Sequence, residues 1–260
     1  MATPKIRLKG FEGGWKECTL NDTIVVNSGR DYKHLNKGDI PVYGTGGFMT
    51  SVNKSLSNED AIGVGRKGTI DKPQYLKAPF WTVDTLFFLT SKKGDVLGFL
   101  FPLLQKVNWK QYDESTGVPS LSKNNIEKII VFKPSIAEQS AIASYFESLD
   151  NLIQTTAKKI ESLKQMKAAS LISMFPQEGE SVPKVRFKGF KGEWRKSAIK
   201  DICQKYASMF SESSLGEDTG NYPVYGAAGY LQKIPSYDFD VPYVGIIKDG
   251  SGVGRCQLYP

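Results

Sequence analysis

The sequence predicts an α+β protein: a domain with a twisted, partly barrel-like sheet, a long helix able to form a coiled coil, and the beginning of a second copy of the domain. Three observations support this prediction. The chain contains a long-period repeat, short β-branched and aromatic runs separated by glycine-bearing loops, and one stretch of about forty residues without glycine or proline.

The repeat is a tandem duplication with a period of about 180 residues. Residues 4–24 return as residues 183–203, with nine of twenty-one positions identical. A second block, IPVYGTGG at residues 40–47, corresponds to YPVYGAAG at residues 222–229. This period is far longer than that of solenoid repeats, so we infer that a whole domain is repeated.

The first domain is expected to combine short strands with two short helices. Strands are predicted at residues 23–26, 62–64, 81–89 and 129–132, which are β-branched or aromatic runs bounded by turn-forming residues. Helices are predicted at residues 95–104 and 124–128. These features divide the chain into a first domain (1–134), a long helix (135–175), a linker (176–182) and an incomplete second domain (183–260).

The long helix has the clearest pattern in the sequence. Ser135 is a suitable N-cap, and Glu138 three residues later would complete a capping box. The residues expected to pair with another helix follow a heptad frame: Ile142, Phe146, Leu149, Ile153, Ile160 and Leu163. A helix of this length spans roughly 60 Å, so this stripe calls for a partner helix. The alternative is that the helix packs on its own domain.

Charge is unevenly distributed along the chain. The net charge of +7 divides into +6 for residues 1–133, −2 for residues 134–182 and +3 for residues 183–260. The repeated parts are therefore basic, and the segment between them is acidic. A basic domain favours a polyanionic partner, although ordinary surface lysines would give the same balance.

Several function classes lack the residues that they need. His34 is the only histidine, and we find no catalytic constellation and no metal-binding pattern. Residues 63–68 have the spacing of a dinucleotide-binding loop, but Pro73 follows too soon for the helix that such a loop requires. A glycine-rich turn that presents Arg66 and Lys67 is the better interpretation.

The sequence also bears on cellular location. No apolar run is long enough to cross a membrane, and the N-terminus does not resemble a signal peptide. The three scattered cysteines, Cys18, Cys203 and Cys256, are typical of reduced thiols. We therefore expect a cytoplasmic protein without membrane contact.

Candidate DNA-binding residues are the cationic, hydroxylic and aromatic side chains of the first domain's loops: Arg30, Lys33, Lys37, Tyr43, Thr45, Arg66, Lys67, Ser120 and Lys123. Such groups bind phosphates and read base edges, and arginine can bind guanine through two hydrogen bonds. Each loop alone could be ordinary surface. The acidic pairs at residues 59–60 and 113–114 are interpreted as solvated turns.

These residues together resemble a known family. The helix start Pro134-Ser135-Ile136-Ala137-Glu138-Gln139, the openings that end in Trp15 and Trp194, the Tyr43-Gly44 and Tyr225-Gly226 turns and the Arg66-Lys67-Gly68 segment are similar to the specificity subunits of type I restriction–modification systems. The resemblance covers essentially the whole chain. It implies two target-recognition domains, each reading half of a bipartite double-stranded DNA site, separated by two long antiparallel helices.

The resemblance further implies a non-catalytic subunit. It would bind two modification subunits, which methylate adenine with S-adenosylmethionine, so that no cofactor is expected in this chain. Restriction subunits would complete the enzyme that cuts unmethylated DNA.

The sequence departs from the family in length, because the second recognition domain is cut short and the second helix is absent. We therefore expect two copies to associate antiparallel through residues 136–175 and to read a palindromic, gapped site. Two alternatives remain open. One is a coiled-coil scaffold that does not bind DNA, and the other is a silent truncated allele that only competes for modification subunits.

Overall fold

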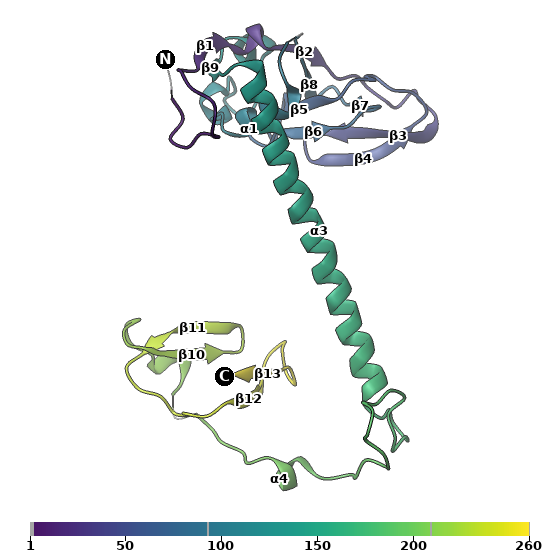
Figure 1. Cartoon of the computed structure of the whole chain (residues 1–260), viewed down its shortest axis with the longest axis vertical. Coiled ribbons are helices and arrows are strands. Elements are labelled where there is room, and N and C mark those ends of the chain that lie inside the picture. Colours follow the sequence, from purple (N-terminus) through teal and green to yellow (C-terminus); the bar gives the residue numbers. More distant parts are fainter. Residues whose placement is uncertain (1–2, 93, 209, 260) are drawn as a thin grey trace. The chain divides into compact units, whose positions relative to one another are not determined.

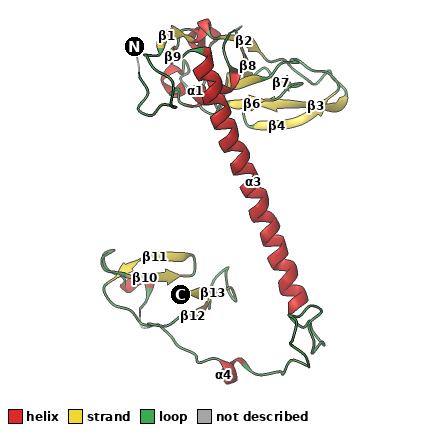
Figure 2. Ribbon diagram, in the orientation of Figure 1, coloured by secondary structure: helices red, strands yellow, loops and turns green. Residues whose placement is uncertain are grey.

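The computed structural model describes residues 3–92, 94–208 and 210–259 (Figure 1). The chain divides into two compact units, residues 1–169 and residues 170–260. The division falls inside the long helix, five residues before its end, so that almost all of this helix belongs to the first unit. Helices and strands occur in both units, as Figure 2 shows, and the α+β class is confirmed.

The strands of the first unit are divided among three sheets. An antiparallel four-stranded sheet has the order β2 (Ile24–Ser28), β8 (Leu86–Ser91), β5 (Ala61–Gly65) and β6 (Gln74–Leu76). A three-stranded sheet has the order β4 (Gly47–Val52), β3 (Lys37–Gly44) and β7 (Trp81–Thr82), with β7 parallel to β3. Strands β1 (Lys16–Thr19) and β9 (Ile130–Lys133) pair antiparallel and join the two ends of the domain.

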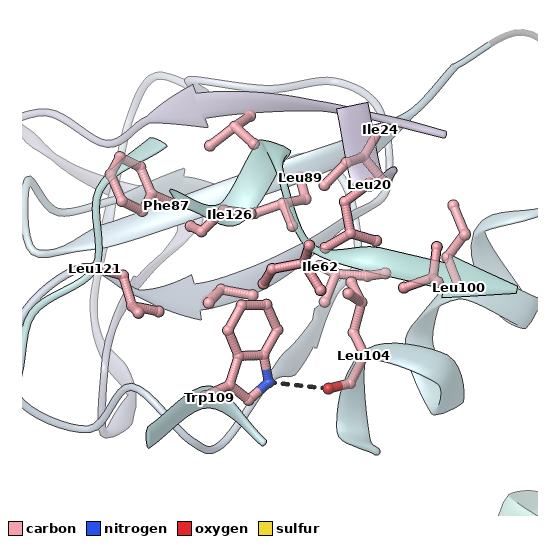
Figure 3. Close-up of a cluster of buried hydrophobic side chains, with 14 of the residues drawn as sticks. Leu20, Ile24, Ile62, Phe87, Leu89, Leu100, Leu104, Trp109, Leu121 and Ile126 are labelled. Carbon is pink, nitrogen blue, oxygen red and sulfur yellow. Dashed lines mark hydrogen bonds between the residues drawn. The ribbon is translucent and has the colours of Figure 1, made fainter. Parts of the chain in front are cut away.

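Successive side chains of a strand point to opposite sides of a sheet, and each face of the four-stranded sheet contributes to its own hydrophobic cluster. Ile62 and Leu89 belong to a cluster with the helices, whereas Ala61 and Phe88 belong to a cluster with β3 and β4. Besides the long helix, the helical elements described in this unit are η1 (Leu20–Asp22), α1 (Leu97–Gln105), η2 (Trp109–Tyr112) and α2 (Lys123–Glu127). Figure 3 shows the first cluster, in which Trp109 Nε1 donates to the carbonyl of Leu104 at 2.9 Å.

One of the strand predictions needs correction. The single strand predicted at residues 81–89 is two strands, β7 and β8, which belong to different sheets. A turn separates them, closed by the hydrogen bond from the Leu86 amide to the Val83 carbonyl (3.0 Å). The turn lets the chain pass from one layer of the domain to the other.

The long helix is α3 (Ile136–Met174), within one residue of its predicted bounds. The expected capping box forms only in part. Ser135 Oγ accepts a hydrogen bond from the Glu138 amide (3.4 Å), but the Glu138 carboxylate binds Arg7 and Trp15 from the opening of the chain. The expected reciprocal cap is thus replaced by a contact between the helix start and its own domain.

The second unit repeats the local structure of the first. Its short helices are α4 (Ile199–Ile202) and η3 (Glu212–Ser214). Its strands form two antiparallel pairs: β10 (Tyr222–Gly226) with β11 (Gly229–Ile234), and β12 (Tyr243–Ile246) with β13 (Cys256–Tyr259). The β10–β11 hairpin matches β3–β4 closely. Both have a register shift before the tyrosine of the turn, and both have an edge-to-face aromatic pair across it, Tyr43–Phe48 and Tyr225–Tyr230. This agreement supports the inferred duplication.

Candidate nucleic-acid interface

The glycine turn after β5 and the loop before α2 are joined by hydrogen bonds. Lys67 and Ser120 form an antiparallel bridge. The Gly68 amide donates to the Pro119 carbonyl (2.8 Å), and the Leu121 amide donates to the Arg66 carbonyl (2.9 Å). Two loops that are more than fifty residues apart in sequence thus form one edge, which carries the exposed side chains of Arg66 and Lys67. We call residues 66–68 and 119–121 the recognition edge.

Asp113 holds the second of these loops in shape. Its Oδ1 accepts hydrogen bonds from the Ser115 amide (2.9 Å), the Ser115 hydroxyl (2.8 Å) and the Ser120 amide (2.9 Å). These bonds, first the one from Ser120 and then those from Ser115, lower the pKa of Asp113 below its usual value. Residues 113–114 thus lie in a loop that reaches solvent, as predicted, and the structure adds a role for Asp113 in holding that loop. The Asp-x-Ser spacing, which is typical of side chains that cap their own turn, was the available signal.

The β3–β4 turn lies next to the recognition edge. A Cβ atom on Gly68 would lie 3.8 Å from Thr45 Oγ1. Gln74 on β6 fixes this turn, because its Nε2 donates to the carbonyls of both Gly44 (3.0 Å) and Thr45 (3.1 Å). Sequence reasoning missed Gln74, since an isolated glutamine in a short strand carries no pattern.

Arg30 approaches the same region through β7. Its amide donates to the Thr82 carbonyl (2.8 Å), and its carbonyl accepts from Trp81 Nε1 (2.8 Å). Thr82 pairs in turn with Tyr43 on β3. The structure therefore connects Arg30, Tyr43, Thr45, Arg66, Lys67 and Ser120 through neighbouring backbone segments.

The other three predicted residues lie at the margins of this group. Lys33 follows Arg30 in an exposed loop, where its amide donates to Asp31 Oδ1 (3.3 Å). Lys37 begins β3 and is thus about 20 Å from the turn at the far end of that strand. Lys123 is the first residue of α2, and its Nζ lies 3.7 Å from Glu127 Oε1.

The cations of the central group keep their charge available. Over residues 3–92, 94–208 and 210–259, no carboxylate lies within ion-pair distance of Arg30, Arg66 or Lys67. The Arg66 guanidinium lies 5.8 Å from the centre of the Phe87 ring, and its Nη1 donates a long hydrogen bond to the Asp84 carbonyl (3.5 Å), so that most of its donors are available to another partner. Exposed, unpaired cations beside hydroxyl groups are suited to bind a polyanion.

The apolar stripe of α3 is exposed over most of its length. The residues predicted to pair have exposed fractions of 41% for Phe146, 36% for Leu149, 65% for Ile153, 49% for Ile160 and 52% for Leu163. Ile142 differs, because it is half-buried and packs against the core of the first unit. The alternative interpretation, a helix packed on its own domain, thus holds only for its first two turns.

The described part of the chain offers no metal centre and no membrane span. Within it, no group of three or more His, Cys, Asp or Glu side chains could hold a metal ion. None of the helices in the same residues is long and apolar enough to span a membrane.

Comparisons with known proteins all identify the same family. A family model described as the type I restriction modification DNA specificity domain matches residues 12–165. The EcoprrI specificity subunit of a type I restriction enzyme from Escherichia coli is 22% identical over 148 residues, covering 53% of this chain and 36% of the relative. The MjaVIII specificity subunit from Methanocaldococcus jannaschii is 27% identical over 162 residues, covering 61% and 36%.

The chain spans little more than a third of the length of these two relatives. A solved structure extends the comparison: the S subunit of a type I restriction–modification system from M. genitalium. It matches with a TM-score of 0.66 and 16% identity, over 98% of this chain and 71% of that one. At this identity the match establishes a shared fold.

Proposed function

Because the chain belongs to the family of type I restriction–modification DNA specificity domains, we propose that it is the DNA-recognition subunit of a type I restriction–modification enzyme. The first domain would read one half of a bipartite target, and the subunit itself would not be catalytic. The observation that carries the proposal is the recognition edge, where Arg66, Lys67 and Ser120 are brought together from two distant loops with Thr45 beside them.

The proposed DNA contacts follow from the chemistry of this edge. Lysine and exposed arginine side chains bind phosphates, while an arginine that enters the major groove can bind guanine through two hydrogen bonds. Gly68 has a φ of +88°, which few other residues adopt, and it lets the turn curve beneath Arg66 and Lys67. The serine and threonine hydroxyls can donate or accept, so that they suit either a phosphate or a base edge.

Removal of the two cations of the turn tests DNA binding directly. Arg66→Ala with Lys67→Ala should weaken binding and reduce the slope of log affinity against log salt by about one unit for each phosphate that is no longer neutralised. The measurement is a salt titration of DNA binding by fluorescence anisotropy. A matched control is Lys106→Ala with Lys128→Ala, which removes two exposed cations outside the recognition edge. Equal effects of the two double variants would contradict the proposed interface.

The exposed stripe of α3 supports pairing with a second copy of the chain. Figure 1 shows α3 extending away from the strands of the first domain. The spacing of Phe146, Leu149 and Ile153 places them on one face of this helix, where they are exposed. In an antiparallel pair each stripe would cover the other, and the two recognition domains would lie at opposite ends. Such a dimer would read a palindromic site with a fixed gap.

Two charges in this stripe should prevent pairing. Leu149→Asp with Ile153→Asp would place carboxylates against an apolar partner surface, so we expect monomers in sedimentation or light-scattering measurements. Glu147→Asp with Gln154→Asp, at exposed positions of the same helix outside the predicted stripe, is the control. A double variant in the stripe that still forms dimers would refute the pairing model.

The apolar surface of α3 is wider than one helix partner requires. Tyr145, Leu152 and Met166 are 53%, 62% and 62% exposed, and they flank the pairing stripe on the side opposite to Phe146 and Ile153. Stripes of this width are typical of helices in bundles, whereas a two-stranded coiled coil uses a narrower one. We assign this second flank to the modification subunits, which would bring S-adenosylmethionine and methylate adenine. Restriction subunits would join that assembly in the cytoplasm.

The alternatives make different predictions in cells. With a cognate modification subunit present, methylome sequencing should find a gapped adenine-methylation motif. A palindromic motif supports the paired form, and an asymmetric one indicates that the second unit also reads DNA. A scaffold or a silent allele would co-purify with modification subunits without producing new methylation.

A further inference from the structure

The start of α3 is fixed to the first domain by a buried carboxylate. Glu138 is 2% exposed, and its two oxygens accept hydrogen bonds from Arg7 Nε (2.8 Å) and Nη2 (2.6 Å). Trp15 Nε1 donates to the same carboxylate at 3.3 Å. Arg7 also donates to the carbonyls of Glu12 and Gly13, so the opening of the chain itself holds the guanidinium in position to bind Glu138.

The next residue forms a second polar anchor. Gln139 is completely buried; its Oε1 accepts from the Val96 amide (3.0 Å), and its Nε2 donates to Asp95 Oδ1 (2.9 Å). The second oxygen of Asp95 pairs with Lys133 Nζ at 2.7 Å. The helix is thus bound both to the segment before α1 and to the end of β9.

A close contact one turn later defines a third point. A Cβ atom on Gly98 of α1 would lie 3.0 Å from the Cβ of Ala143, so the two helices meet with almost no space between them. Ile142 packs into the domain core beside this contact. The three points come from different elements and contact the side of the helix that faces the domain, over its first two turns, so that they restrict both its tilt and its rotation.

We propose that this joint, formed by Arg7, Trp15, Asp95, Lys133, Glu138 and Gln139, holds α3 at one angle to its domain and thereby restricts the protein to a single gap between the two half-sites that it reads. The inference rests on the proposed function. Buried ion pairs contribute little net stability, since their desolvation offsets their attraction. However, planar groups that each make two directed hydrogen bonds fix the orientation of the helix, whereas a purely apolar contact would not.

The length of α3 makes the gap sensitive to this joint. About 26 residues separate Ala143 from the end of the first unit, or roughly 40 Å of helix. A tilt of about 5° at the root would move the far end by roughly 3.5 Å, which is about the rise of one base pair. A joint that held α3 less firmly would therefore let one recognition domain reach neighbouring base pairs.

Distance measurements between spin labels test the joint without DNA. Labels at Asn58→Cys in the domain and Lys158→Cys on α3, in a variant with all three native cysteines replaced and diluted with unlabelled protein, report the spread of helix positions. Glu138→Gln and Gln139→Ala should broaden the distance distribution by roughly 2 Å, the displacement at Lys158 for a tilt of about 5°. The matched controls are Glu147→Gln and Gln154→Ala, which are exposed on the same helix.

The proposal is overturned if the two joint variants give distributions as narrow as those of their controls. If Gln139→Ala does not fold, Arg7→Lys provides the same comparison, because it keeps the positive charge and removes the two-pronged contact with Glu138.

Methylome sequencing then connects the joint to specificity. The chain without substitutions, together with its modification subunit, should give a methylated motif with one gap length. The joint variants should give additional motifs with neighbouring gap lengths and unchanged half-sites. A single unchanged gap in variants whose label distances have broadened refutes the inference. No motif with the unmodified chain would instead refute the proposed function, and the label distances would still decide whether the joint holds the helix.

Discussion

Single residues fix the recognition edge, and Asp113 is the one most open to test by pH. Its pKa is lowered because Ser120 and Ser115 donate hydrogen bonds to the ionised carboxylate. Its contribution to stability is therefore fully present above the pKa of the unfolded chain, near 3.9. That contribution is lost as the pH falls through the lower pKa of the folded protein.

We expect the amide resonances of Ser115 and Ser120 to titrate together below about pH 4, a range set by the ordinary pKa of aspartate, as the loop loses its acceptor. Asp113→Asn should abolish this titration, and it should weaken DNA binding through Ser120. An NMR pH titration of both proteins makes the measurement. Unchanged amide shifts in the natural chain over that range would show that Asp113 does not hold the loop.

The residue scale also shows where sequence reasoning stops. Arg66 and Lys67 could be identified because they lie in a glycine-rich turn. A proline follows this turn too soon for the helix of a nucleotide-binding site, so the two cations are left for another ligand. Their pairing with Ser120 could not, because no local pattern encodes a bridge between segments more than fifty residues apart. Glu138 was noticed for the wrong reason, since its spacing from Ser135 suggested a cap while its carboxylate serves the joint.

At the scale of elements, periodicity predicted α3 well, and composition predicted the buried strand β5 and the partly buried strands β2 and β9. The β3–β4 hairpin was missed as structure although its turn was singled out. β3 contains Gly38 and Pro41 and shows no regular alternation, because a register shift interrupts it. Its pairing with β7 was equally hidden, since parallel neighbours in a sheet leave no short-range signal.

Gln74 is expected to decide the shape of the hairpin turn. Gln74→Ala removes two hydrogen bonds to the carbonyls of Gly44 and Thr45, so we expect the free energy of unfolding to fall by about 1–2 kcal/mol. Amide exchange in residues 44–47 should become faster. Urea unfolding and hydrogen exchange measure both effects, and Gln111→Ala, an exposed glutamine, is the control. If the two variants are equally stable, the turn holds its shape without Gln74.

At the scale of the whole molecule, the length of α3 should determine the gap between half-sites. Inserting a second copy of residues 149–155 adds one heptad and keeps the apolar stripe in frame. The helix grows by about 10 Å, so the methylated motif should gain a gap of roughly three base pairs.

A five-residue insertion at the same point provides the contrast. It turns the following helix by about 140°, so the stripe no longer faces its partner. We expect monomers and no methylation, as measured by light scattering and methylome sequencing. An unchanged gap after the heptad insertion would mean that α3 does not separate the two reading domains.

The duplicated opening of the chain has a consequence for how such proteins change over generations. Arg7 reaches the Gly13 carbonyl, and Arg186 reaches the Gly192 carbonyl in the same way (2.6 Å), so both openings fold alike. A genetic crossover within either repeat would leave this arginine and the following tryptophan in place on both sides of the exchange. A DNA-recognition domain acquired in this way would carry the arginine and tryptophan that hold the start of the long helix. A new specificity could therefore be inherited as one segment, while the geometry of the assembly is kept.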